Sequence, residues 1–202
     1  MDKKRVLFIG NSITRHEPAP DIGWHGSWGM AASCEQNDYV HLMVRLFKKA
    51  NIPVEYMLKN IADFERSFWD YDFENLKALR EFAADIIIMR IAENVSKEEA
   101  ACRNFGKYFD ELIRYIDPKK MAMVICSNGF GEHDTVNAQI KEAAEKNGFP
   151  LADLSALFFN DENKALREFT HEGVNAHPSD AGMATIANIL FSHIMREVGR
   201  QK

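Results

Sequence analysis

The chain has 202 residues, 46% of them apolar, which is enough to fill the core of one compact α/β domain. Its net charge of −5 argues against nucleic-acid binding. Three cysteines without CxxC or Cys/His spacing predict free thiols and no metal site, and no apolar stretch is long enough for a signal peptide or a membrane span. We therefore expect a cytoplasmic protein with a single domain over residues 1–202 and no cofactor, with neither nucleic acid nor membrane as a partner.

The first predicted strand ends close to a serine. Residues 6–9 form a short continuous apolar run, which is typical of a strand buried on both faces of a parallel sheet. Gly10 and Asn11 follow, so Ser12 stands at the carboxyl end of this strand, where open α/β folds place their ligands. Judged on this stretch alone, Ser12 could equally cap a helix or bond to turn amides.

A long segment over residues 15–37 has neither helical nor strand periodicity. Loops of this length in compact domains are usually functional or disordered, and its two tryptophans, Trp24 and Trp28, argue against disorder. We expect an ordered substrate loop, including Gly29, over the edge of the first strand. The indole rings either contact a sugar or an acyl group, or only attach the loop to the body of the protein.

The rest of the chain alternates between predicted helices and strands. Further strands are predicted over residues 54–58, 84–91, 121–126 and 150–154. Helices are predicted over residues 38–50, 73–82, 97–116 and 136–146, with a last one after Asp180; Ser96 and Glu99 form a capping box before the third of them. This alternation predicts a three-layer α/β/α sandwich around a five-stranded parallel sheet.

Parallel strands present their carboxyl ends at one edge of the sheet. That edge should therefore collect Ser12, residues 60–65, Asn94, residues 127–128 and the loop containing His177. A serine, a histidine and a side-chain amide at one edge are the groups that acyl transfer requires.

Three motifs resemble those of the SGNH (GDSL-type) hydrolases. Residues 10–14, Gly-Asn-Ser-Ile-Thr, resemble the first block of that family, which usually reads Gly-Asp-Ser. Asn94 matches the asparagine of the third block, and His177-Pro178 matches the last block, in the family's order along the chain. The resemblance implies a flavodoxin-like SGNH hydrolase fold and a carboxylic ester hydrolase.

Carried over to this chain, the resemblance implies Ser12 as nucleophile and His177 as its general base. Asn94 would donate to the oxyanion beside the backbone N–H of Ser12. A serine hydroxyl needs a base to take its proton, and imidazole titrates near neutral pH. We expect an esterase that removes a small acyl group such as acetyl, with a small-molecule substrate; Trp24, Trp28 and Trp69 suggest a carbohydrate alcohol. The alternative is a weakened or inactive carbohydrate-binding protein of the same fold.

The chain departs from the family pattern before the histidine. The position three residues before it, where the family has an acid, is Val174. We therefore expect a Ser–His dyad whose imidazole is oriented by a backbone carbonyl, with Glu172 as the second choice. Loss of the orienting acid costs about 10⁴-fold in other serine hydrolases, so a slow enzyme is compatible with this pattern.

Two further departures concern the oxyanion donors and the residue before Asn94. The second family block normally offers a glycine N–H, but the stretch after the second strand has no glycine. Ala62 or Asp63 would then donate its backbone N–H, or Gly29 from the long loop would do so. Glu93 precedes Asn94, and we expect it to be a buried structural partner of Arg90 rather than a group that faces the substrate.

Overall fold

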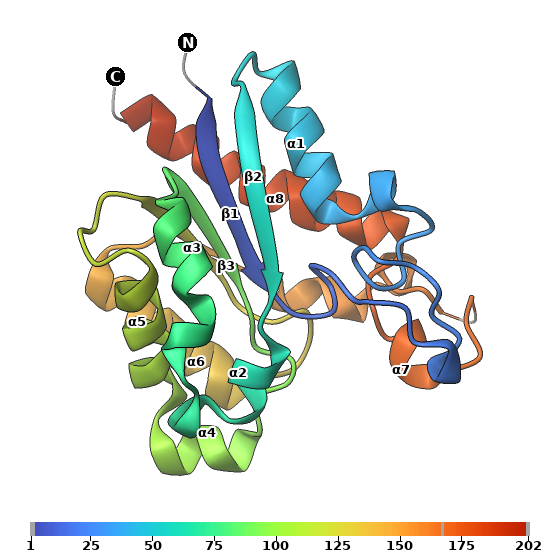
Figure 1. Ribbon diagram of the computed structural model, residues 1–202. Helices are drawn as coiled ribbons and strands as arrows, with labels where there is room; N and C mark the ends of the chain where they lie inside the picture. The colour runs from blue at the N-terminus through green and yellow to red at the C-terminus, as the bar shows by residue number, and fades with distance from the viewer. Residues whose placement is uncertain (1–2, 167, 201–202) are drawn as a thin grey trace.

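The structure, a computed structural model, describes residues 3–166 and 168–200. Five parallel strands form one sheet in the order β2-β1-β3-β4-β5 (Figure 1). The strands are β1 (Lys4–Gly10), β2 (Val54–Asn60), β3 (Ile86–Arg90), β4 (Met123–Ser127) and β5 (Leu151–Ala152). All five predicted strands are present, although β5 has two residues instead of the five expected.

Alternate residues of the strands supply two separate cores, one on each face of the sheet. In β1, Val6 and Phe8 belong to one core, and Leu7 and Ile9 belong to the other. The helices α1 (Tyr39–Lys49) and α8 (Asp180–Arg200) cover the first face. The second face is covered mainly by α3 (Lys77–Phe82), α5 (Phe105–Ile116) and α6 (Asp134–Asn147) (Figure 1). This is the predicted three-layer α/β/α sandwich.

The strand order explains where a ligand site forms. The connection through α1 leads from β1 to β2 on one face, and the connection through α3 leads from β2 to β3 on the other. The order therefore reverses between β1 and β3, and in open parallel sheets such a reversal leaves a crevice at the carboxyl ends of the strands. Ser12 follows β1 and Asn94 follows β3, so both lie at this point.

The predicted helix over residues 97–116 is two helices. The first, α4 (Lys97–Arg103), begins after Ser96, whose hydroxyl accepts a hydrogen bond from the Glu99 N–H as predicted. Asn104 then adopts a left-handed conformation, with a φ of 61°, and its side chain caps α5. A continuous helix is impossible through such a residue, so the expectation of one helix is wrong.

The remaining elements are short. The stretch expected only as a connection contains α2 (Ala62–Arg66), and α7 (Glu172–Asn175) precedes His177. The 3₁₀ helices span Pro20–Ile22, Glu35–Asn37, Phe68–Asp70, Phe73–Leu76, Ser155–Phe159 and Asp161–Asn163. Among the described residues, none of the helices combines the length and the apolar character needed to cross a lipid bilayer.

Candidate active site

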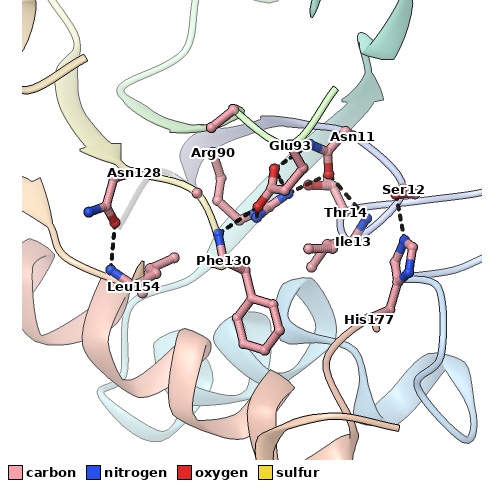
Figure 2. Close-up of polar contacts among 12 residues, drawn as sticks. Asn11, Ser12, Ile13, Thr14, Arg90, Glu93, Asn128, Phe130, Leu154 and His177 are labelled. Atoms are coloured by element: carbon pink, nitrogen blue, oxygen red, sulfur yellow. Dashed lines mark hydrogen bonds and ion pairs between the residues drawn. The ribbon is translucent and has the colours of Figure 1, made fainter. Parts of the chain in front are cut away.

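Ser12 and His177 lie in contact at the carboxyl edge of the sheet, although 165 residues separate them in the chain. Ser12 Oγ is 2.8 Å from His177 Nε2 (Figure 2). The turn after β1 brings Ser12 to this place, because Thr14 and Arg15 both donate their backbone N–H to the Asn11 carbonyl. Gly10 is required for this turn, since a Cβ there would lie 1.8 Å from Thr14 Oγ1.

The imidazole of His177 is oriented by a backbone carbonyl. Its Nδ1 is 2.7 Å from the Gly173 carbonyl oxygen, in α7. A carbonyl only accepts hydrogen bonds, so Nδ1 carries the proton and the lone pair of Nε2 faces Ser12. Burial lowers the pKa of His177 below its ordinary value, and the Gly173 carbonyl offsets part of this effect. The imidazole is therefore neutral at pH 7 and able to accept a proton.

The two other positions considered before His177 do not contact its ring. Glu172 is exposed in the first turn of α7, and among the described residues no hydrogen bond joins its carboxylate to His177. Val174 is 1% exposed and packs with Trp24 and Met30 in a small core beneath the loop. Of the two expected arrangements, the structure contains the one with a backbone carbonyl, and Glu172 as the orienting acid is wrong.

Asn94 borders the same pocket as Ser12 and His177. Its Nδ2 donates to Glu65 Oε2 at 2.7 Å. An amide nitrogen carries two hydrogens, so this bond leaves one N–H of Asn94 for another acceptor. The structure thus brings together the three residues that the family motifs indicated.

The other expected oxyanion donors differ in whether their backbone N–H already has a hydrogen-bond partner. The Ala62 N–H already donates to Asn60 Oδ1 at 2.8 Å, and the Gly29 N–H donates to the buried Asp38 at 3.2 Å. Both N–H groups already have partners in this arrangement, so the structure gives no support to these two predictions. Asp63 lines the pocket in the first turn of α2, where backbone N–H groups have no helical partner.

The pocket has a volume of about 700 Å³ and a wall of mixed polar and apolar character. Besides the three residues above, its polar lining consists of Arg15, His16, Glu17, Lys59, Asn60, Asp63, Arg66 and His171. Two ion pairs lie along this wall, Arg15 with Glu17 at 3.0 Å and Arg66 with Asp63 at 3.3 Å. Ile22, Met30 and Val174, which belong to one small apolar cluster, give it an apolar patch, and Leu58 also lines it.

The tryptophans attach the long loop to the body of the protein and do not line this pocket. Trp24 is 3% exposed and donates from its indole to the His16 carbonyl, while Trp28 donates to the Ala32 carbonyl. Their rings meet edge to face at 5.6 Å. These contacts fit the role of fixing the loop, and the expectation that Trp24, Trp28 and Gly29 contact substrate stays a prediction. Trp69 lies under the Arg103 guanidinium, away from the pocket.

A buried polar network lies directly behind Ser12. Arg90 is completely buried and its Nη1 pairs with Glu93 Oε1 at 2.7 Å, so the expected partnership of these two residues is present (Figure 2). Burial alone would raise the pKa of Glu93, but the Arg90 guanidinium outweighs it and lowers this pKa to about 2. Asn11 donates to Glu93 Oε2 at 2.5 Å and to Glu65 Oε1 at 3.0 Å, and its carbonyl oxygen accepts from Arg90.

Glu65 is the member of this site that sequence reasoning missed. Its side chain is completely buried, and its carboxylate accepts hydrogen bonds from Asn11, from the Ala92 N–H at 2.7 Å and from Asn94. The sequence does contain a pattern that could have revealed it. Glu65 shares the i, i+3, i+4, i+7 spacing of a buried helix face with three apolar residues, Ile61, Phe64 and Phe68. This spacing puts the glutamate on the inward face of α2. All four side chains are at most 2% exposed.

Comparisons with known proteins give matches among solved structures. Searches of protein-family models and of curated protein sequences found no match. A two-domain esterase active on acetylated mannans is 16% identical, with a TM-score of 0.63 over 96% of this chain and 49% of that chain, so this chain spans about half its length.

Two full-length matches have a similar size. An acetyl xylan esterase, AlAXEase, is 20% identical, with a TM-score of 0.55 over 93% of this chain and 98% of that chain. A lipase/acylhydrolase from Enterococcus faecalis is 14% identical, with a TM-score of 0.59 over 98% of this chain and 96% of that chain. At these identities the likeness concerns the fold. The chain has the α/β fold of the SGNH (GDSL-type) esterases and acylhydrolases.

Proposed function

We propose that this protein is a serine esterase that removes a small acyl group from a polar alcohol. The observation that carries the proposal is the 2.8 Å contact between Ser12 Oγ and His177 Nε2, with Nδ1 of the same ring bonded to the Gly173 carbonyl at 2.7 Å. This arrangement presents a neutral imidazole lone pair to a serine hydroxyl, which is what an activated nucleophile requires.

The chemistry follows from the positions of these groups. His177 Nε2 takes the Ser12 proton as Oγ attacks the ester carbonyl carbon, and the carbonyl oxygen becomes an oxyanion. The Ser12 backbone N–H and the second N–H of Asn94 donate to that oxyanion, and each such donor is typically worth about 10²–10³-fold in rate. His177 then gives its proton to the departing alcohol. A water molecule, activated by the same imidazole, releases the acyl group as a carboxylic acid.

The carbonyl partner of His177 sets a limit on the expected rate. It holds the ring in the productive tautomer, so the large penalty of a wrong tautomer does not apply. It carries no full negative charge, however, and burial makes the imidazolium formed during attack less stable. We therefore expect an enzyme that works, but more slowly than one with a carboxylate behind the histidine.

The lining of the pocket supports a short acyl group and a polar alcohol. Its apolar patch of Ile22, Met30 and Val174 is small, so a long lipid chain would have to extend past it and bury itself against charged side chains such as Arg15, Lys59 and Arg66. The esterases with acetylated mannan and acetyl xylan in their descriptions support an acetylated carbohydrate as the substrate. The tryptophans give no support for a sugar, because they do not line this pocket.

The test combines labelling with turnover. A fluorophosphonate should add once to the protein, and intact-mass and peptide analysis should map the adduct to Ser12. Hydrolysis of p-nitrophenyl acetate should fall by about 10³-fold or more in Ser12→Ala. Ser27→Ala, an exposed serine in the long loop, is the matched control and should retain the wild-type rate.

The outcomes separate the candidate functions. A loss of less than about tenfold in Ser12→Ala, or an adduct at another residue, would contradict the proposed nucleophile. Absence of any adduct together with measurable glycan binding would instead favour the carbohydrate-binding alternative. A rate that rises from acetate to octanoate esters would contradict the short acyl group.

A further inference from the structure

Glu65 is a buried carboxylate that the proposed chemistry does not use. It lies on the inward face of α2 and is completely buried. Its Oε1 accepts from Asn11 at 3.0 Å and from the backbone N–H groups of Ala92 and Asn94 at 2.7 and 3.4 Å. Its Oε2 accepts from Asn94 Nδ2 at 2.7 Å. Two of these four contacts therefore come from Asn94.

The neighbouring residue in α2 contacts the other end of the same side-chain amide. Arg66 Nη2 donates to Asn94 Oδ1 at 3.4 Å, while Glu65 accepts from Asn94 Nδ2. An ionised carboxylate only accepts hydrogen bonds, and a guanidinium only donates them. Only one of the two flip states of the Asn94 amide satisfies both neighbours. In the other state an amide oxygen would face a carboxylate, and an NH₂ group would face a guanidinium.

The flip state matters because the two ends of the amide have opposite polarity. In the observed state, Nδ2 uses one hydrogen for Glu65 and keeps the second for the pocket that Asn94 shares with Ser12 and His177. In the flipped state, an acceptor oxygen would replace this nitrogen. An oxyanion needs donors, so the flipped amide would remove a stabilising contact and add repulsion.

We propose that Glu65, assisted by Arg66, is a positioning residue that holds the Asn94 amide in the flip state able to donate to the oxyanion. The catalytic meaning of this arrangement rests on the proposed esterase function. The Glu65–Asn94 contact itself can be tested without it.

The charge on Glu65 decides whether this arrangement holds. Two charged side chains act on it: Glu93, which is joined to it through Asn11, and Arg90 from β3. Arg66 of the same helix contacts Asn94 and Asp63, and His177 lines the adjoining pocket. Burial, and then the charge of Glu93, raise the pKa of Glu65 to about 7. A proton on Oε2 would point at the Nδ2 donor of Asn94, and the amide would flip to accept it. The ionised form is the active one, so activity should rise with pH through the pKa of Glu65.

Glu65→Gln is the decisive variant. Glutamine has nearly the same side-chain shape as glutamate, and like the protonated acid it is uncharged and carries a hydrogen-bond donor at every pH. We expect kcat for p-nitrophenyl acetate to fall by about 10²-fold while KM changes less than about threefold, as for loss of a donor used in the transition state. In the pH profile of the remaining kcat, the acid limb should move to lower pH, where His177 titrates. Glu98→Gln, an exposed carboxylate on α4, is the control and should keep the wild-type profile.

A double-mutant cycle separates positioning from a merely structural role. If Glu65 acts through Asn94, adding Glu65→Gln to Asn94→Ala should cost less than about threefold more in kcat. Rates are taken per mole of folded protein, measured by circular dichroism. Full additivity of the two losses, or a Glu65→Gln enzyme with wild-type kcat and an unmoved acid limb, would overturn the proposal.

Nuclear magnetic resonance gives a readout that requires no turnover. The side-chain ¹⁵N signal of Asn94, assigned by its loss in Asn94→Ala, should shift with pH with a midpoint near that of Glu65, and this shift should be absent in Glu65→Gln. An Asn94 signal that does not respond to pH would overturn the proposal even in an active enzyme. Conversely, a protein without turnover or Ser12 labelling but with this titration would contradict the esterase function alone.

Discussion

Two histidines in this protein each contact a backbone or side-chain oxygen through Nδ1 and a hydroxyl through Nε2, but the partners differ. His177 Nδ1 bonds to the Gly173 carbonyl at 2.7 Å, and its Nε2 is 2.8 Å from the Ser12 hydroxyl. His41 Nδ1 bonds to the Asp38 carboxylate at 2.8 Å, and its Nε2 is 3.2 Å from the Tyr56 hydroxyl. The carboxylate expected behind a catalytic histidine is thus present, but it stands behind the histidine that faces no serine.

The difference shows what the partner atom does to an imidazole. The hydrogen bond from His41 to Asp38 raises the pKa of His41. Burial lowers the pKa of His177, and the Gly173 carbonyl and the more distant charge of Glu93 offset only part of this effect. On the other side of His41, burial raises the pKa of Tyr56, so that phenol keeps its proton at neutral pH. An imidazole bonded to a carboxylate is therefore a stronger base than one bonded to a carbonyl. It can act as a general base, however, only where its lone pair faces a reactive hydroxyl.

The largest difference in activity should appear when the two imidazoles are removed in separate variants. His177→Ala removes the proposed base and should reduce p-nitrophenyl acetate hydrolysis by about 10³-fold or more. His41→Ala should leave the rate within about threefold, because His41 does not line the pocket that contains Ser12. Equal losses in the two variants, with both proteins folded, would show that the comparison is wrong.

The second test places a carboxylate at the family position behind His177. Val174→Asp would bury a charge beside Trp24 and Met30, and we expect a loss of about 3 kcal/mol or more in the free energy of unfolding. Val174→Ala, which adds no charge, should cost roughly 2 kcal/mol. Urea unfolding measures both. A Val174→Asp protein with wild-type stability and a higher kcat would mean that the loop accommodates an orienting acid.

The third test measures the two imidazoles directly. In ¹H–¹⁵N spectra, His177 should titrate below the ordinary histidine pKa of about 6.5, and His41 should titrate above it. Asp38→Asn should lower the pKa of His41 and leave that of His177 unchanged. If the order of the two values is reversed, burial does not control His177 as described.

The smallest effect is expected at a second pocket of about 330 Å³, which is lined by Trp28, His41 and Tyr56 among others. Trp28→Phe keeps an aromatic ring but loses the 2.8 Å hydrogen bond to the Ala32 carbonyl. We expect a loss of about 1 kcal/mol in stability and a change in KM of less than about twofold. A tenfold rise in KM for a carbohydrate ester would instead support Trp28 as a substrate contact.

The fold was predictable because buried parallel strands leave a strong local pattern. The runs over residues 6–9 and 84–91 are apolar on both faces, and helical periodicity separates them. The break at Asn104 was not predictable from the apolar spacing of the sequence, which runs from Ala101 to Ile116 without interruption. The left-handed conformation affects only one residue, so the spacing of apolar residues gives no indication of it.

The candidate site was predictable where motifs carried it and missed where only packing did. Ser12, Asn94 and His177 stand in recognisable motifs. Glu65 was read as one charge in a polar connection, because its hydrogen bonds come from residues 27 and 54 positions away in the chain. The roles of the tryptophans were undecided for the same reason, since a ring at the edge of a sheet packs inward or outward according to its tertiary neighbours.

The long separation between Ser12 and His177 has a consequence for biosynthesis. On a ribosome that adds about 5–20 residues per second, the histidine is made roughly ten to thirty seconds after the serine. A nascent chain therefore carries a Ser12 hydroxyl without its imidazole partner until all five strands have been synthesised and the segment containing His177 has folded back onto the end of β1. The proposed esterase activity would therefore appear only when the last segment has folded onto the sheet, and its appearance during translation would report that step.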